Sequence, residues 1–146
     1  MQEQKKIIFV INPISGGKKK TAFNKKVLET LDLQLFNPTF KQTTGPNHAY
    51  ELGLEAIKEG YDAVVAVGGD GTINELGSAL VNSGIPLGII PEGSGNGLAL
   101  YLGIPMNEAA AIRRLNRFET FEVDSGTINN RSFFNIAGLG FDATVS

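Results

Sequence analysis

The stretch VAVGGDGTINEL, residues 65–76, joins a short apolar run to a helical pattern through a turn that holds three glycines. The run DAVVAV that leads into it is typical of a buried strand in a parallel sheet. Beyond the turn, Ile73, Leu76, Gly77 and Leu80 recur at helical spacing. We therefore expect a strand-to-helix junction, with glycines that let the backbone approach a ligand closely.

The same alternation continues through the chain on both sides of this stretch. Strand-like runs lie at residues 5–12, 34–43, 62–67 and 85–91, and Pro38 predicts that the second of them lies near a sheet edge. Helical patterns separate them, at Phe23, Val27, Leu28 and Leu31, at residues 47–60, 73–80 and 94–103, and finally at residues 106–118. The sequence thus predicts an α/β fold, with an open, mostly parallel sheet covered by helices on both faces.

The alternation of strand-like and helical patterns ends after residue 118. Two strand-like runs flank Asn129 and Asn130, a pair that favours a hairpin turn. The chain then ends at GFDATVS, directly after another strand-like run. We expect an α/β nucleotide-binding domain over residues 1–118 and the truncated start of an antiparallel β domain over residues 119–146. Unpaired strand edges in such a region would favour a homo-oligomer.

The composition excludes several kinds of protein. The 146 residues carry a formal net charge of −2, which gives no sign of a nucleic-acid partner, and they include no cysteine for a disulfide or thiolate site. The N-terminus is too polar for a signal peptide, and no apolar stretch approaches the length of a transmembrane segment. We therefore expect a cytoplasmic protein.

Three glycine-rich loops follow predicted strands: NPISGGK, GGDGT and PEGSGNG. In a parallel sheet such loops meet at the carboxyl edge, where backbone N–H groups and helix N-termini bind phosphate. Lys19 stands where a Walker A loop needs glycine, and Leu98 stands where a dinucleotide fingerprint needs glycine or alanine. The loops therefore indicate a nucleotide site of another kind.

Asp70 stands in the bend of the opening stretch, where an aspartate often does no more than form a turn. Thr72 and Glu75, however, have the spacing of a capping box. If they cap the helix, the Asp70 carboxylate precedes the helix and can face a ligand, a metal ion or a hydroxyl proton. For Thr72 and Glu75 themselves, a structural and a functional role both stay open.

The combination of VVAVGGDGTINELGSAL with IPLGIIPEGSGNGLALYLG resembles the diacylglycerol kinase catalytic-domain superfamily, which holds diacylglycerol, sphingosine and ceramide kinases and bacterial lipid-kinase-like proteins. INPISGGKK, TTGPNHAYELGLEA and FFNIAGLGFDATV extend the resemblance over most of the chain. The resemblance implies an ATP- and Mg²⁺-dependent lipid kinase of phospholipid biosynthesis that meets its lipid substrate peripherally at the membrane surface. It also implies a fold like the N-terminal domain of NAD kinases and diacylglycerol kinases, followed by a β-sandwich.

The resemblance assigns roles residue by residue. Asp70 and Glu75 would be catalytic, Asp70 either as the base on the lipid hydroxyl or as part of a magnesium–water network. Asp124 would belong to the metal site, and Asp142 would contact the lipid substrate or else cap a turn. The nucleotide would be bound by Asn12, Ser15, Gly16, Gly17, Thr43, Gly68, Gly69, Gly71, Thr72, Ser94, Gly95 and Asn96.

Some features depart from the family pattern or stay open. Gly97 replaces an acidic residue that many bacterial members carry, and Ser94 resembles the sphingosine kinase branch. The lysines at 18–20 would either add positive charge near the phosphates or form a solvated surface. His48, the single histidine, is expected to cap or pack at a helix start rather than act as a base. An NAD kinase-like enzyme and a non-catalytic nucleotide-binding module are the alternatives.

Overall fold

The computed structural model describes residues 3–13, 20–92, 97–101, 103–123, 126–128, 131–133 and 136–139. Its main feature is a six-stranded sheet in the order β2-β1-β3-β4-β8-β5, in which only β5 runs antiparallel to its neighbour. A separate two-stranded sheet is formed by β6 and β7. The strands are β1 (Lys5–Ile11), β2 (Phe36–Gln42), β3 (Ala63–Gly68), β4 (Leu87–Pro91), β5 (Thr120–Val123), β6 (Gly126–Ile128), β7 (Arg131–Phe133) and β8 (Ile136–Leu139).

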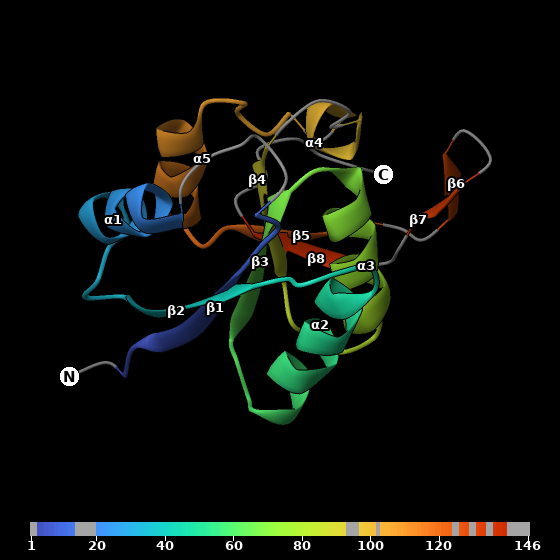
Figure 1. Cartoon of the computed structure of the whole chain (residues 1–146), viewed down its shortest axis with the longest axis horizontal. Coiled ribbons are helices and arrows are strands. Elements are labelled where there is room, and N and C mark those ends of the chain that lie inside the picture. The colour runs from blue at the N-terminus through green and yellow to red at the C-terminus, as the bar shows by residue number, and fades with distance from the viewer. Residues whose placement is uncertain are drawn as a thin grey trace.

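Helices cover both faces of the main sheet, as the alternating pattern predicts. In Figure 1, α1 and α5 lie on one side of the sheet, and α2 and α3 lie on the other. The prediction of a parallel α/β fold is therefore confirmed. The helices are α1 (Lys20–Thr30), α2 (His48–Lys58), α3 (Asp70–Leu80), α4 (Gly97–Tyr101) and α5 (Glu108–Leu115).

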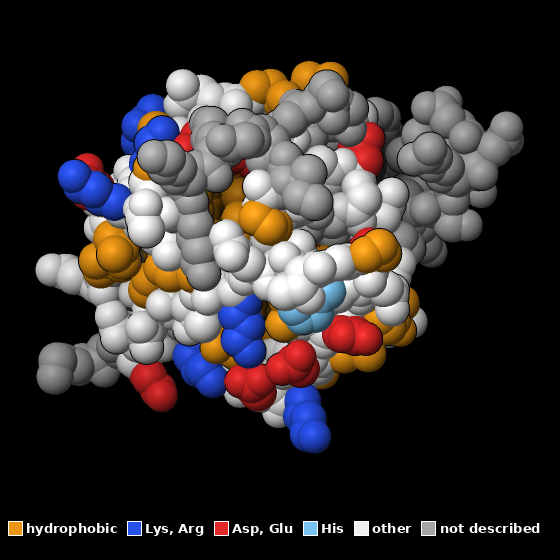
Figure 2. Space-filling model, viewed as in Figure 1, with side chains coloured by type: hydrophobic (Ala, Val, Ile, Leu, Met, Phe, Trp, Pro, Cys, Tyr) orange, Lys and Arg blue, Asp and Glu red, His pale blue; other side chains and the backbone are white. Residues whose placement is uncertain are grey.

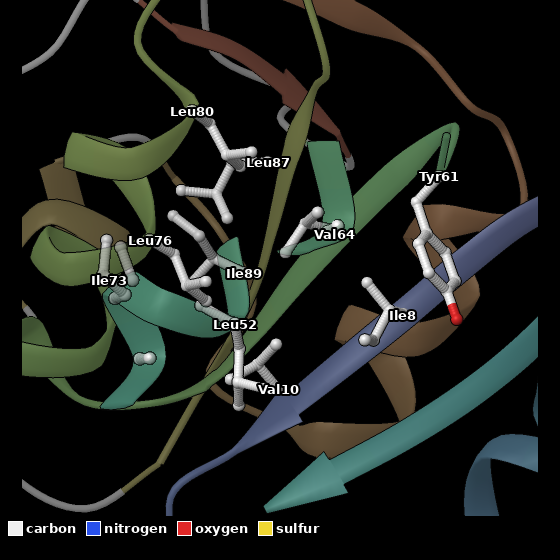
Figure 3. Close-up of a cluster of buried hydrophobic side chains, with 14 of the residues drawn as sticks. Ile8, Val10, Leu52, Tyr61, Val64, Ile73, Leu76, Leu80, Leu87 and Ile89 are labelled. Carbon is white, nitrogen blue, oxygen red and sulfur yellow. The ribbon is translucent and has the colours of Figure 1, made fainter. Parts of the chain in front are cut away.

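Each face of the sheet has its own hydrophobic core. Along β1, Ile8 and Val10 belong to the core under α2 and α3, whereas Ile7 and Phe9 belong to the core under α1 and α5. Figure 3 shows the first core, where side chains of α2 and α3 meet those of β1, β3 and β4. Burial on both faces explains why the strands read as continuous apolar runs in the sequence.

The edge position of β2 confirms the interpretation of Pro38. Within the described sheet β2 pairs only with β1, and Pro38 lies opposite Ile7. An edge strand tolerates proline because one side of its backbone needs no donor for a neighbouring strand.

Two helices differ from their predicted patterns. Leu28 is 47% exposed, so the buried stripe of α1 runs through Phe23 and Val27 without it. Helix α5 is shorter than predicted because Asn107 precedes it and accepts a hydrogen bond from the backbone N–H of Ala110 at 2.9 Å. That bond satisfies one of the free donors of the first turn and fixes where the helix begins.

Gly53 allows α2 and α3 to pack closely. A Cβ atom at this position would lie 2.6 Å from the Cβ of Ala79 and 3.3 Å from Cδ2 of Leu76. Any larger residue would force the two helices apart, which explains a glycine in the middle of α2 despite its low helix propensity. The packing of α2 against α3 in turn places the two helix N-termini beside each other at the edge of the sheet.

Strands β5 and β8 belong to the main sheet, which the sequence pattern after residue 118 does not predict. β8 pairs in parallel with β4 through Leu87 and Gly88, and β5 pairs with β8, so both strands extend the main sheet. β6 and β7 pair antiparallel up to Ile128 and Arg131, which confirms the predicted hairpin, although its two asparagines lie outside the described residues. The separate antiparallel domain over residues 119–146 is not confirmed, and the boundary at residue 118 stays a prediction.

No helix in the described part of the chain is both long enough and apolar enough to cross a membrane.

Candidate active site

The carboxyl ends of β1, β2 and β3 meet at one edge of the sheet. Ile11 pairs with Gln42 on one side and with Val67 on the other. Hydrogen bonds continue this ladder one residue further, from the N–H of Asn12 to the carbonyl of Val67 at 3.0 Å and from the N–H of Thr43 to the carbonyl of Ile11 at 2.9 Å. Two residues expected to bind nucleotide, Asn12 and Thr43, therefore start adjacent loops at the same edge.

Gly68 ends β3 in a place where no side chain fits. A Cβ atom there would lie 2.8 Å from Oγ1 of Thr72 and 3.3 Å from the Cβ of Asn12. Thr72 is 5% exposed and packs into the space that the glycine leaves. The backbone carbonyl of Gly68 accepts a hydrogen bond from the N–H of Glu92 at 3.0 Å, which joins the end of β4 to the same edge.

Helix α3 begins at Asp70, directly after Gly68 and Gly69, and this start shows that the predicted capping box is wrong. Gly69 is the N-cap residue, in an extended conformation and without a side-chain cap, and its carbonyl accepts from the N–H of Ile73 at 3.1 Å. Thr72 lies inside the first turn and is buried against Gly68, so it does not cap the helix. Two consecutive glycines let the chain pass from strand to helix without the residues that a capping box needs.

Asp70 is the first residue of α3, rather than a residue that precedes the helix. Its Oδ2 atom accepts a hydrogen bond from the backbone N–H of Gly97, the first residue of α4, at 3.3 Å. Its Oδ1 atom is buried and has no hydrogen-bond partner in the described part of the chain. A carboxylate is favourable at a helix N-terminus, but a buried oxygen without a partner is costly unless a ligand, a proton or a cation meets it.

A pocket of about 510 Å³ lies between the loop that follows β2 and the first turns of α3. Glu75 is its only charged lining residue in the described part of the chain, and Glu75 is half-buried. The other described lining residues are all uncharged, and most of them are small. The lining consists of Asn12, Pro13, Thr43, Thr44, Gly45, Pro46, Ala49, Gly71, Thr72 and Glu75.

The structure thus brings together the described residues that the sequence singles out. Asn12, Thr43, Gly71, Thr72 and Glu75 line one pocket. Gly68, Gly69 and Asp70 form the strand-to-helix junction beside it. The remaining predicted site residues lie outside the described residues: Ser15, Gly16, Gly17, Ser94, Gly95, Asn96, Asp124 and Asp142.

A preformed metal site is not visible in the described residues, which contain no group of three or more His, Asp or Glu side chains placed to hold an ion. The free Oδ1 of Asp70 is nevertheless the kind of hard oxygen ligand that Mg²⁺ prefers. Asp70 therefore fits a magnesium ion that is held mainly by water and by nucleotide phosphates, with few protein ligands.

Sequence reasoning missed part of the pocket. Thr44, Gly45 and Pro46 line it beside Thr43. The signal was a Gly-Pro turn directly after a predicted strand, at the edge where the other loops gather.

Comparisons with known proteins place the chain in a family. A family model described as "Diacylglycerol kinase catalytic domain" matches residues 6–128. The chain is 34% identical over 140 residues to a protein named diacylglycerol kinase from Bacillus subtilis, covering 93% of this chain and 46% of that protein. It is 35% identical over 121 residues to sphingosine kinase B of Dictyostelium discoideum, covering 77% of this chain and 16% of that protein.

A crystal structure titled as a diacylglycerol kinase from Bacillus anthracis shares the fold, with a TM-score of 0.77 at 24% sequence identity. The alignment covers 91% of this chain and 47% of that structure's chain, so the present chain spans about half of the length of that protein and of the Bacillus subtilis relative. The residues matched by the family model include β1 from its second residue, β2 to β4, the glycine junction with Asp70 and the described pocket lining. The chain belongs to the diacylglycerol kinase catalytic domain family, a family of lipid kinases.

Proposed function

We propose that this chain forms the nucleotide-binding part of a kinase that transfers the γ-phosphoryl group of ATP to a hydroxyl group of a diacylglycerol- or sphingosine-type lipid. The observation that carries the proposal is the buried Oδ1 of Asp70, which has no hydrogen-bond partner among the described residues, beside a pocket at the carboxyl edge of the sheet. Family membership supports phosphoryl transfer, and the lipid is our inference from the names of the relatives.

The pocket lining suggests how ATP is oriented. Glu75 would repel phosphates, so the sugar and base of ATP are the better occupants of the space beside it, where its carboxylate can accept hydrogen bonds from sugar hydroxyls. The phosphates then extend toward the backbone of Gly69, Asp70 and Gly71, where the N-terminus of α3 favours negative charge and magnesium would offset the charge of the Asp70 carboxylate. We propose that residues 15–17 and 94–96 also bind the phosphates. Gly68 would serve the site by allowing close packing at its base.

The reaction requires positioning and the neutralisation of charge more than covalent chemistry. The lipid hydroxyl oxygen forms a bond to the γ-phosphorus, the bond from that phosphorus to the bridging oxygen breaks, and ADP leaves. Asp70 accepts the hydroxyl proton or orders the water around the metal, and both roles use its free Oδ1. Magnesium would supply positive charge to the phosphates, with Asp70 and Asp124 as its protein contacts, and Asp142 would contact the lipid head group.

The test is phosphate transfer by the full-length protein, with radiolabelled ATP and Mg²⁺, to vesicles that contain diacylglycerol, sphingosine or ceramide, and separately to NAD. We expect label in one of the lipids and none in NAD. We also propose that the enzyme is cytoplasmic and meets its lipid substrate peripherally at the membrane surface.

Two results would contradict the proposal. Labelled NADP would identify an NAD kinase-like enzyme. ATP binding without transfer to any acceptor would identify a non-catalytic nucleotide-binding module.

A further inference from the structure

We propose that His48 is a positioning residue for the nucleotide pocket, and that its Nδ1 atom holds the loop between β2 and α2 in the conformation that ATP binds. The inference rests on the proposed function, because it takes the pocket to be the ATP site. The loop comprises residues 43–47, and it contributes Thr43, Thr44, Gly45 and Pro46 to the pocket lining. His48 does not line the pocket itself, so it would act through these neighbours.

Hydrogen bonds tie the loop down at both ends. At its start, the N–H of Thr43 donates to the carbonyl of Ile11 in β1 at 2.9 Å. At its end, His48 bonds back to the loop twice. Its own N–H donates to the carbonyl of Gly45 at 3.3 Å, and its Nδ1 accepts from the N–H of Thr44 at 2.9 Å.

The bond to Nδ1 fixes the tautomer of the imidazole ring. A backbone N–H can only donate, so Nδ1 carries no hydrogen and the ring hydrogen lies on Nε2. The hydroxyl of Thr44 lies 3.2 Å from the same nitrogen and is a second potential donor to it. Of the two, the backbone bond is the shorter and is present whatever side chain stands at position 44.

His48 is not an ordinary helix cap, because its Nδ1 accepts from the loop N–H of Thr44 and not from an N–H of the first turn of α2. Asn47 is the N-cap residue of α2, but its side chain makes no capping bond, and its φ of 68° places it in the left-handed region that asparagine tolerates. Asn47 therefore reverses the chain, and the histidine that follows it closes the turn. The side-chain bond from the helix to the preceding loop comes from the first helical residue instead of from the cap.

The location of this bond indicates a role in binding more than in folding. Thr44 is exposed and His48 is half-buried, and the histidine side chain is visible on the face shown in Figure 2. Hydrogen bonds at such exposed sites contribute little to global stability. Without the bond, however, Thr44 and Gly45 would sample other conformations, and ATP binding would have to order them.

Three variants of the chain separate these effects. His48→Leu removes the acceptor at similar size, whereas His48→Asn keeps an oxygen at the position of Nδ1, since both atoms are bonded to Cγ. Thr44→Val removes only the hydroxyl and keeps the backbone donor. For each variant we would measure the solvent-exchange rate of the residue-44 amide by NMR, the affinity for Mg²⁺·ATP by calorimetry and the melting temperature.

We expect His48→Leu to speed exchange of the Thr44 amide and to weaken ATP binding about five- to tenfold, the effect of ordering roughly one backbone residue on binding. His48→Asn should resemble the wild type in all three measurements, Thr44→Val should keep the slow exchange of the residue-44 amide, and the melting temperature should stay nearly constant. In the full-length enzyme, His48→Leu should raise KM for ATP and leave kcat nearly unchanged, because His48 does not touch the reacting groups.

Unchanged exchange in His48→Leu would overturn the inference, since the loop would then be held by other contacts. Faster exchange with unchanged affinity would overturn it as well, since the loop conformation would not matter to the nucleotide. If the wild-type chain binds no ATP, the proposed function fails and the role in nucleotide binding fails with it. The exchange rates of wild type and His48→Leu show in that case whether His48 still holds the loop.

Discussion

Replacing Asp70 with asparagine is expected to lower phosphate transfer to lipid by at least about 100-fold, the usual lower range for the loss of a group that accepts a proton. Asparagine has nearly the same shape and keeps an oxygen that can accept from the N–H of Gly97. It has no charge, however, and can neither accept the hydroxyl proton nor attract magnesium. Affinity for ATP should change little, because the pocket lining stays intact. The measurement is kcat with the preferred lipid, alongside calorimetry with ATP.

Asp62→Asn is a matched control for this substitution. Asp62 precedes β3 at the opposite end from Asp70, and its Oδ2 accepts from the N–H of Lys6 at 2.7 Å, a bond that an asparagine oxygen can also accept. We expect wild-type kcat for Asp62→Asn. Activity of Asp70→Asn within a few-fold of the wild type would show that the free Oδ1 is not part of the chemistry.

Replacing Gly68 with alanine is expected both to destabilise the fold and to damage the pocket. The new Cβ would lie 2.8 Å from Oγ1 of Thr72 and 3.3 Å from the Cβ of Asn12, and both residues line the pocket. We expect the free energy of unfolding to fall by about 1–3 kcal/mol, the usual cost of overpacking. We expect Kd for ATP to rise about tenfold or more, which corresponds to about 1.4 kcal/mol of binding free energy. Urea unfolding and calorimetry measure the two effects.

Gly71→Ala is the control for Gly68→Ala. It also removes a glycine from the motif, but it does not create the close contact expected at position 68. Gly71 lies in the first turn of α3, and a Cβ atom there would meet no atom of the described residues within 4 Å. Its stability should equal that of the wild type or exceed it by up to about 1 kcal/mol, since alanine favours helices. Equal stability of Gly68→Ala and Gly71→Ala would contradict the close approach of Thr72 to β3.

The parallel core of the fold could be predicted because its signals are local. Runs such as DAVVAV are short, apolar on both faces and followed at once by glycine, and these features together identify a buried parallel strand. The place of β8 could not be predicted in this way. It pairs with β4 only through Leu87 and Gly88, whose partners lie some fifty residues later along the chain, and nothing local encodes such a contact.

The candidate site was predictable in part because some of its residues also belong to local sequence patterns. Asn12 and Gly71 belong to glycine-rich loops that were predicted to lie at one edge of the sheet, and both line the pocket there. Thr43, which the resemblance places near the nucleotide, lines the same pocket. The capping box failed because its spacing rule ignores the two glycines that bring the helix start forward to Asp70. Thr44 and Pro46 were missed although the stretch TTGPNHAYELGLEA contains them, because they reach the pocket through the path of the loop.

The measurement that most directly tests the central claim, that ATP binds at this edge of the sheet beside Asp70, is NMR relaxation of the labelled chain in the presence of Mn²⁺·ATP. Paramagnetic Mn²⁺ broadens the signals of nearby amides, and Mn²⁺ without nucleotide is the reference. We predict nucleotide-dependent broadening that is strongest at Gly69, Asp70 and Gly71 and weaker at Thr43. Broadening centred elsewhere, or the same broadening without ATP, would contradict the account.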